Sequence, residues 1–286
     1  MAQESTDSTG AVSVTLLPNA QLHNSYVLNL LRATWEGINL LRPNTRNFII
    51  ARGGYAGMQR YAALWTGDSG STWDFLRINL PEVLNLGLSG VPISGCDIGG
   101  FAKIDQFVDG IDTAFPNTYI AGEPFTAASV EGGITNYELL TRWMQLGSFL
   151  PWYRNHYDGY NKQFQEPYAY GEPVPSNCRK YVELRYRMMQ VYYDAMYQWT
   201  QTGMPIARAL FLNDSNDPQV YANANVSSEF YVGADFLVAP ITDPHDCLNP
   251  PTPPTRSVYL PAGSNWYQFM DNISPILGAI GGGAGD

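Results

Sequence analysis

Residues 48–68 read FIIARGGYAGMQRYAALWTGD. One short apolar run ends at Arg52 and opens into a glycine-rich loop, and a second ends at Trp65 and continues to Asp68. Short buried strands that each finish on a polar side chain are typical of parallel β/α units. A carboxyl group held beside a large apolar ring has its charged form disfavoured, so it can carry a proton near neutral pH. Asp68 is therefore a candidate general acid.

A structural role for the same carboxylate competes with this interpretation. The segment after Asp68 predicts a helix over residues 72–88, bent by Pro81. Aspartate and serine are preferred residues at helix N-termini, where they accept hydrogen bonds from free backbone N–H groups. Asp68 or Ser69 would then serve as the N-cap of that helix.

Apolar periodicity divides the remaining sequence into alternating strands and helices as far as Gly203. Beyond Gly203, strand-like runs are separated by Asn, Asp, Pro and Gly clusters, which predicts an all-β module. Residues 102–133 are irregular and rich in small residues. The predicted helices cover residues 24–43, 72–88, 136–148 and 179–200, and the predicted strands cover 48–51, 62–65, 91–94, 149–154, 205–212, 230–241, 257–260 and 265–270.

Polar, titratable residues follow four of the predicted strands. They are Arg52, Asp68, Asp97 and His156. Because the carboxyl ends of parallel strands meet at one rim, we expect these side chains to converge there. The pattern predicts an α/β fold with its site at that rim.

Composition and charge exclude several functions. The formal net charge is −10, and no basic stripe is present to hold phosphates, so we expect no nucleic-acid partner. No apolar run approaches membrane-spanning length, and residues 1–10 are polar, unlike a signal peptide. The three cysteines and three histidines are scattered, which predicts no metal site, and we expect no cofactor.

Several motifs, in order and at consistent spacing, resemble glycoside hydrolase family 31. This family contains α-glucosidases, α-xylosidases and α-1,4-glucan lyases. The resemblance runs from about residue 22 to residue 269. It implies the second half of a (β/α)₈ barrel in residues 1–203, followed by the start of a β-sandwich domain in residues 204–286. The motifs are Arg52 with WTGD at 65–68, GCDIGGF at 95–101, RWMQLG at 142–147, RNH at 154–156 and YVGADFLVAP at 231–240.

The same resemblance implies roles for individual residues. Asp68 is similar to the general acid/base of the family, and Asp97 to a carboxylate that orients its neighbours. Ser69 departs from the family pattern, which usually has Asn there. The residues that the resemblance places against the sugar are Arg52, Trp65, Phe101 and His156.

The family nucleophile is an aspartate on an earlier strand, in a motif resembling Asp-Met-Asn. No such motif stands in residues 1–21. We therefore expect the nucleophile to lie outside this chain, and the isolated chain to be inactive without the N-terminal half of the barrel. A half-barrel also predicts that apolar strand residues such as Val91 and Ile93 meet water or another chain.

Three functions remain open from the sequence. The first is a piece of a retaining α-glucosidase that acts on α-glucosides or α-glucans. The second is an α-1,4-glucan lyase, which the residues after His156 and the segment QEPYAY at 165–170 resemble. The third is a non-catalytic carbohydrate-binding protein built on a degenerate barrel.

Overall fold

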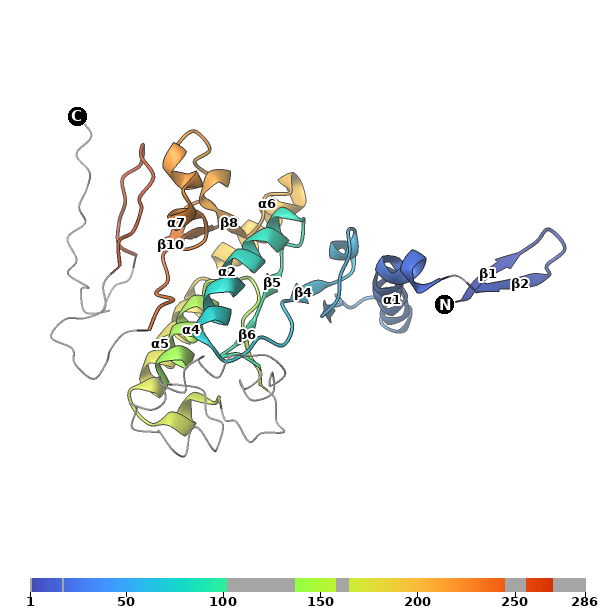
Figure 1. The fold of residues 1–286 in the computed structure, drawn as a ribbon, viewed down its shortest axis with the longest axis horizontal. Helices are drawn as coiled ribbons and strands as arrows, with labels where there is room; N and C mark the ends of the chain where they lie inside the picture. Colours follow the sequence, from blue (N-terminus) through green and yellow to red (C-terminus); the bar gives the residue numbers. More distant parts are fainter. Residues whose placement is uncertain (1, 17, 102–136, 158–164, 245–255, 270–286) are drawn as a thin grey trace.

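The computed structural model describes residues 2–16, 18–101, 137–157, 165–244 and 256–269 (Figure 1). The predicted irregular segment at 102–133 lies outside these ranges. The helices are α1 (Asn19–Leu41), α2 (Trp73–Leu88), α4 (Tyr137–Gly147), α5 (Val174–Arg187), α6 (Met189–Thr202) and α7 (Asn223–Val226). The strands are β1 (Ala2–Thr6), β2 (Val12–Leu16), β3 (Ile50–Ala51), β4 (Ala63–Trp65), β5 (Ser94–Gly95), β6 (Asp97–Ile98), β7 (Arg154–Asn155), β8 (Ala207–Ala209), β9 (Phe230–Val232) and β10 (Phe236–Val238).

The strands between β3 and β7 pair in parallel and in chain order. β4 lies between β3 and β5, and β6 pairs with β7. Only Cys96 separates β5 from β6, so this one segment joins β4 on one side to β7 on the other. The sheet and its helices form part of a (β/α)₈ barrel, which confirms the predicted fold class.

The four predicted barrel strands are all shorter in the structure, and two of them show why. The run at 149–154 contributes only Arg154–Asn155 to the ladder, because Phe149 and Leu150 turn back onto the end of α4 with N–H···O distances of 3.0 Å. The run at 91–94 joins β4 first through the carbonyl of Ile93, which accepts the N–H of Leu64 at 3.1 Å, and β5 itself begins at Ser94. Turn hydrogen bonds at the strand entrances therefore replace ladder bonds that the apolar pattern predicts.

The helix predicted over residues 179–200 is two helices, which is a correction. α5 begins earlier, at Val174, and the chain bends at Met188, whose φ and ψ are −88° and 1°. The bend directs the Met188 side chain into the core, where it is almost fully buried. Gly203 ends α6 as predicted, with φ of +78° and an N–H bond of 2.8 Å to the carbonyl of Trp199.

A hairpin and a long helix precede the sheet. β1 and β2 pair antiparallel around the turn at Asp7, an element that the sequence analysis does not include. α1 begins at Asn19 rather than at residue 24, and together with the hairpin it extends to one side of the molecule (Figure 1). Its inner face buries Leu31 against Met58 and Leu64.

The main apolar core continues from the barrel helices into the antiparallel strands. Leu80 of α2 and Trp143 of α4 belong to the same buried cluster as Ala207 of β8 and Phe230 of β9. Gly87 on α2 allows this approach, since a Cβ there would lie 3.0 Å from Pro205. Within 256–269 the predicted strands at 257–260 and 265–269 do not form, and Tyr259 and Trp266 instead pack as side chains on a smaller cluster.

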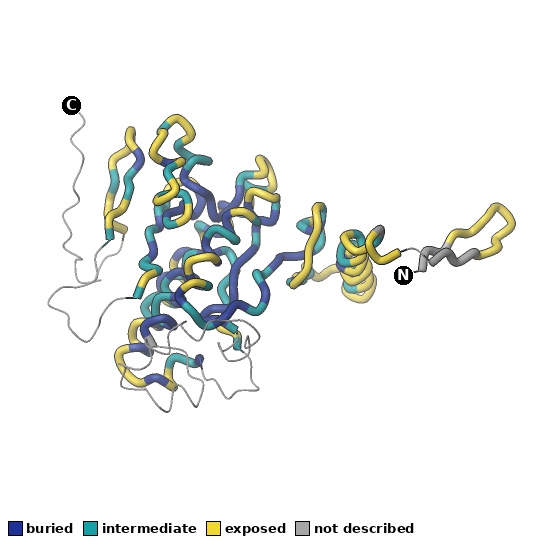
Figure 2. The backbone as a smooth tube through the Cα atoms, in the orientation of Figure 1, coloured by how far each residue is buried: buried dark blue, intermediate teal, exposed yellow. Residues whose placement is uncertain are grey.

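The most exposed aliphatic side chains lie at the end of α1. Val91 is only 5% exposed and belongs to a buried cluster with Leu64, so the expectation that it meets water is wrong, and Ile93 is half-buried against the main core. Leu40 and Leu41, at the end of α1, are 83% and 82% exposed, and Leu30 and Phe48 are also exposed (Figure 2). Among the described helices, none has both the length and the apolarity needed to cross a bilayer.

We expect this apolar end of α1 to cause self-association of the isolated chain, since contiguous exposed apolar surface favours contact between copies. Replacing Leu40→Glu together with Leu41→Glu should shift sedimentation velocity profiles toward monomer. Asn29→Glu with Asn44→Glu adds the same charge at exposed polar positions and is the matched control. Equal effects of the two pairs would assign the change to net charge rather than to the apolar surface.

Candidate active site

Asp68 lies in the loop after β4 and forms an ion pair with Arg52, which directly follows β3. The distance from Arg52 Nη1 to Asp68 Oδ2 is 3.1 Å. The Asp68 side chain is 33% exposed, so the carboxylate can be reached from solvent. Its nearest charged neighbour is a cation, where the sequence predicts an apolar wall. The two strand ends thus hold a carboxylate and a guanidinium in contact at the rim.

The helix cap predicted at Asp68 or Ser69 is instead Thr72, which is a correction. The Thr72 hydroxyl accepts the N–H of Phe75 at 3.2 Å, three residues into the helix. This is the usual N-cap geometry, and it satisfies a backbone donor that Asp68 would otherwise serve. Asp68 is therefore not used as a cap.

Asn79 of α2 anchors the loop that carries Asp68. This buried amide accepts a bond from the Thr66 hydroxyl at 2.7 Å and donates to the Ser69 hydroxyl at 3.2 Å. Its amide also donates to the carbonyl of Phe75 at 2.7 Å. Ser69, the position that departs from the family pattern, is thus buried and hydrogen-bonded to the helix.

Two glycines bring Phe101 to the same loop. Gly99 and Gly100 both have positive φ, of 91° and 81°. A Cβ on Gly100 would lie 2.5 Å from the backbone of Ser71, so only glycine fits there. The turn allows the N–H of Phe101 to donate to the carbonyl of Ser69 at 2.7 Å. The GCDIGGF and WTGD motifs are therefore in direct backbone contact.

Asp97, at the start of β6, is fully buried and pairs with Arg154 of β7. Arg154 Nη2 donates to Asp97 Oδ1 at 2.6 Å. Burial raises the pKa of the Asp97 carboxyl above its usual value, although the hydrogen bond from Arg154 opposes the shift. The Arg154 guanidinium also lies 5.2 Å from the ring centroid of Trp65 and 5.7 Å from that of Trp152. One cation thus links three neighbouring strand ends.

Phe101 and His156 complete the cluster. Their ring centroids are 5.2 Å apart, in a tilted arrangement. His156 follows β7 and interacts electrostatically with Asp97, as does Asp68. The structure therefore brings together all six residues singled out in the sequence, Arg52, Trp65, Asp68, Asp97, Phe101 and His156.

Four buried polar atoms in this cluster have no hydrogen-bond partner among the described residues. They are Trp65 Nε1, Asp97 Oδ2, Trp152 Nε1 and Arg154 Nε. Buried polar groups in proteins are nearly always satisfied, so these atoms are exceptions among the described residues. Three of them are donors and one is an acceptor.

Sequence reasoning missed the positioning roles of Arg154, Trp152 and Asn79. The signal for Asn79 was a polar residue on the apolar face of α2, between Leu76 and Leu80. Arg154 stood inside a recognised motif, but only the pairing of β6 with β7 shows what it contacts. Within the described ranges, no group of three or more His, Cys, Asp or Glu side chains is arranged to hold a metal ion.

Comparison with known proteins gives the family. The "Glycosyl hydrolases family 31 TIM-barrel domain" matches residues 2–195, and the "Glycosyl hydrolase family 31 C-terminal domain" matches residues 203–280. The chain belongs to glycoside hydrolase family 31. The resemblance of the motifs is thereby confirmed.

Family 31 relatives are similar over most of this chain. Alpha-glucosidase 2 of Bacillus thermoamyloliquefaciens is 38% identical over 250 residues, which cover 87% of this chain and 26% of the relative. A probable glucan 1,3-alpha-glucosidase of Oryza sativa is 34% identical, and the match covers 24% of that relative's length. The chain thus spans about a quarter of these relatives.

Solved structures of the family share the fold. A dextranase of Flavobacterium johnsoniae, in complex with glucose, superimposes with a TM-score of 0.64 at 30% identity, over 79% of this chain and 25% of the dextranase. The family 31 alpha-glucosidase of Bacteroides thetaiotaomicron has a TM-score of 0.59 at 33% identity, over 74% of this chain and 30% of its own.

Arg154→Met removes the cation that compensates the buried Asp97. We expect the free energy of unfolding to fall by about 3 kcal/mol near neutral pH, the lower end of the range for a broken buried pair, because Arg154 is partly exposed. Burial already holds the pKa of Asp97 in the folded state above its usual 3.8, and losing Arg154 removes an effect that lowers it. Protonation then neutralises the stranded carboxylate, so the deficit should shrink as the pH falls toward 3.8.

Urea unfolding of both proteins across this pH range measures the effect. The double variant Asp97→Asn with Arg154→Met is the control, since it has no carboxylate to strand. The double variant should lose less unfolding free energy than Arg154→Met does, and this loss should not change with pH through residue 97, because an asparagine at this position does not titrate. A deficit in Arg154→Met that stays constant from neutral to acid pH would contradict the assignment.

Proposed function

We propose that this chain carries the general acid/base and part of the sugar-binding surface of a retaining α-glucosidase. The observation that carries the proposal is the convergence at one rim of the accessible Asp68, its partner Arg52, His156 and the rings of Trp65 and Phe101. Sugar hydroxyl groups can hydrogen-bond to Asp68, Arg52 and His156, and the aromatic rings of Trp65 and Phe101 offer apolar surface for the sugar ring. The names of the relatives, which are α-glucosidases and glucan 1,3-alpha-glucosidases, support the substrate class.

In this proposal Asp68 protonates the glycosidic oxygen as the bond to the leaving group breaks. In the second step it takes a proton from the water that attacks the glycosyl-enzyme. Arg52, 3.1 Å from the carboxylate, orients it and stabilises the charged form that exists between the two steps. His156, Phe101 and Trp65 contact the sugar, and Asp97 fixes Arg154 against Trp65.

The nucleophile belongs to a part of the enzyme outside this chain. No Asp-Met-Asn-like motif precedes the region that resembles the family, and the chain spans about a quarter of its relatives. We propose that residues 1–203 belong to the catalytic barrel and residues 204–286 to the β-domain that follows it. The 286-residue chain by itself should then turn over no α-glucoside.

The alternatives are weaker. The relatives with activity names are glucosidases rather than lyases, which favours hydrolysis. A sugar-binding module without catalysis needs no proton donor, and the relatives that this chain resembles carry the names of enzymes rather than of binding proteins. The substrate is therefore proposed to be a terminal α-glucoside or an α-glucan.

A chimera tests the role of Asp68. This chain replaces the corresponding quarter of the Bacillus alpha-glucosidase 2, which supplies the rest of the barrel. Asp68→Asn should lower kcat/KM for maltose by roughly 10²- to 10⁴-fold. The loss in the glycosylation step should be much smaller with 4-nitrophenyl α-glucoside, whose leaving group needs little protonation. That dependence on the leaving group separates an acid from a merely structural residue.

Asp74→Asn, an exposed acid in the first turn of α2, is the matched control and should leave both rates unchanged. Product analysis separates the two reactions, since hydrolysis releases glucose and elimination releases an anhydro-sugar. Equal losses with both substrates would reject Asp68 as the acid, and an anhydro-sugar product would reject the hydrolase.

A further inference from the structure

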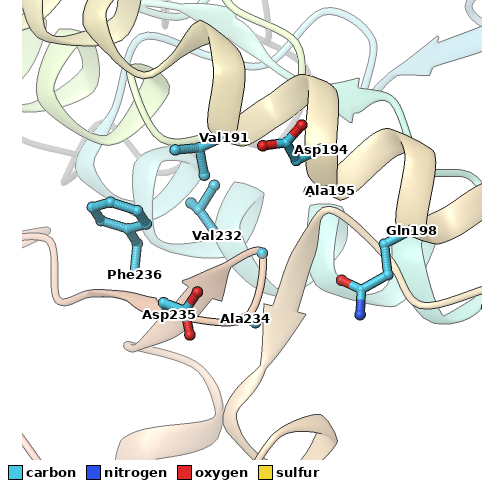
Figure 3. A pocket seen from close by; sticks show the side chains of 9 residues that line it. Val191, Asp194, Ala195, Gln198, Val232, Ala234, Asp235 and Phe236 are labelled. Carbon is cyan, nitrogen blue, oxygen red and sulfur yellow. The ribbon is translucent and has the colours of Figure 1, made fainter.

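A cavity of about 220 Å³ lies between α6 and the turn that joins β9 to β10 (Figure 3). None of the six candidate active-site residues lines it. The volume is below the roughly 300–1,000 Å³ typical of pockets for drug-sized ligands, so it suits an occupant of about one ring. We call it the α6 cavity. Its side-chain lining includes Val191, Asp194 and Gln198 from α6, and Val232, Asp235 and Phe236 from the β9–β10 hairpin.

One buried arginine fixes both walls of the α6 cavity. Arg208 of β8 is only 2% exposed and donates through Nη2 to the side-chain oxygen of Gln198. It also donates through Nη1 to Asn213 Oδ1 at 3.4 Å, and Asn213 Nδ2 donates to the carbonyl of Ala234 in the hairpin turn at 3.0 Å. The helix wall and the hairpin wall are therefore held before any ligand arrives, which lowers the entropy cost of binding.

The charges at the α6 cavity disfavour an anion. Asp194 and Asp235 stand on opposite walls, and their carboxylates repel a negative charge. The buried guanidinium of Arg208, which lies behind Gln198 and interacts with Asp235, offsets part of the charge of the two carboxylates. Arg208 donates to the Gln198 oxygen, so the group of this amide that remains for a ligand is its NH₂ donor, and a donor disfavours a cation. A ligand that both donates to carboxylates and accepts from an amide is a polyhydroxyl compound.

We propose that the α6 cavity is a second carbohydrate-binding site, which takes one pyranose unit of a neutral α-glucan. Hydroxyl groups of the sugar donate to Asp194 and Asp235 and accept from Gln198. The apolar face of the ring rests on Phe236, Val191 and Val232. The site goes beyond the proposed catalytic function and does not use Asp68.

An amide NMR titration of the full 286-residue chain with maltose tests the site. The shifts of the Gly233, Ala234 and Asp235 amides report occupancy of this cavity separately from the active-site rim. Asp194→Asn and Asp235→Asn keep the side-chain shape and should each weaken the affinity read at these amides by about tenfold, as expected for a lost hydrogen bond to a charged group. Ala234→Phe, which fills the cavity, should abolish the shifts.

Glu183→Ala on α5 is the matched control and should bind as the parent chain does, since Glu183 is exposed and does not line the cavity. Asp68→Asn should also leave unchanged the maltose affinity that is read at the Gly233–Asp235 amides. Thermal melting of every variant confirms that the fold is retained.

Maltose shifts confined to residues around Asp68, or no shifts at all, would overturn the proposal. So would binding of tetramethylammonium or inorganic phosphate at the Gly233–Asp235 amides with no response to maltose. The catalytic proposal is judged separately by the chimera. If Asp68→Asn leaves turnover by the chimera unchanged while maltose still binds at the α6 cavity, only the catalytic role of Asp68 is rejected.

Discussion

The buried carboxylate of Asp97 is the charge on which the arrangement of the candidate active site depends. A fully buried carboxylate is costly unless a cation compensates it, so β7 must present Arg154 beside β6. That guanidinium in turn packs against Trp65 at the end of β4 and against Trp152. One buried charge thereby sets the relative positions of three strand ends, and with them the loop that carries Asp68.

Close backbone approach is the second constraint on the rim. Gly95 of β5 faces the carbonyl of Trp152, and an added Cβ would lie 2.2 Å from that oxygen. The Gly99–Gly100 turn similarly presses against Ser71. These approaches leave no space for side chains, so the backbone itself forms the floor under the polar cluster. The rim therefore depends on glycine at these positions as much as on the side chains of the polar cluster.

The antiparallel strands and the barrel helices share one core, and this has a consequence for the α6 cavity. Arg208 lies on β8, whose neighbours Ala207 and Ala209 pack in the main cluster with α2. The same strand therefore ties the hairpin turn to α6 through a buried cation. Where two kinds of secondary structure meet in this way, side chains from both can converge on a single cavity, as Gln198 and Asp235 do.

Much of the fold and of the site follows from local sequence. Short apolar runs that end on Arg52, Trp65 and Asp97, separated by helical periodicity, are sufficient to indicate parallel β/α units, because buried strands and amphipathic helices have different apolar periods. Motifs of fixed spacing identify the six rim residues, and each of these residues lies within a few residues of a strand end.

Tertiary contacts decided what local patterns could not. The N-cap went to Thr72 rather than to Asp68, because Arg52 and Asn79 fix the loop that precedes the helix. The helix over 179–200 broke at Met188, where the side chain enters the core. Val91 was buried in a cluster that includes Leu31, which lies 60 residues earlier in the chain. The sequence determined which residues stand at strand ends and what chemistry they can perform. Only the packed structure determined which partners they meet, because pairing between strands and the burial of charge depend on residues far apart in the chain.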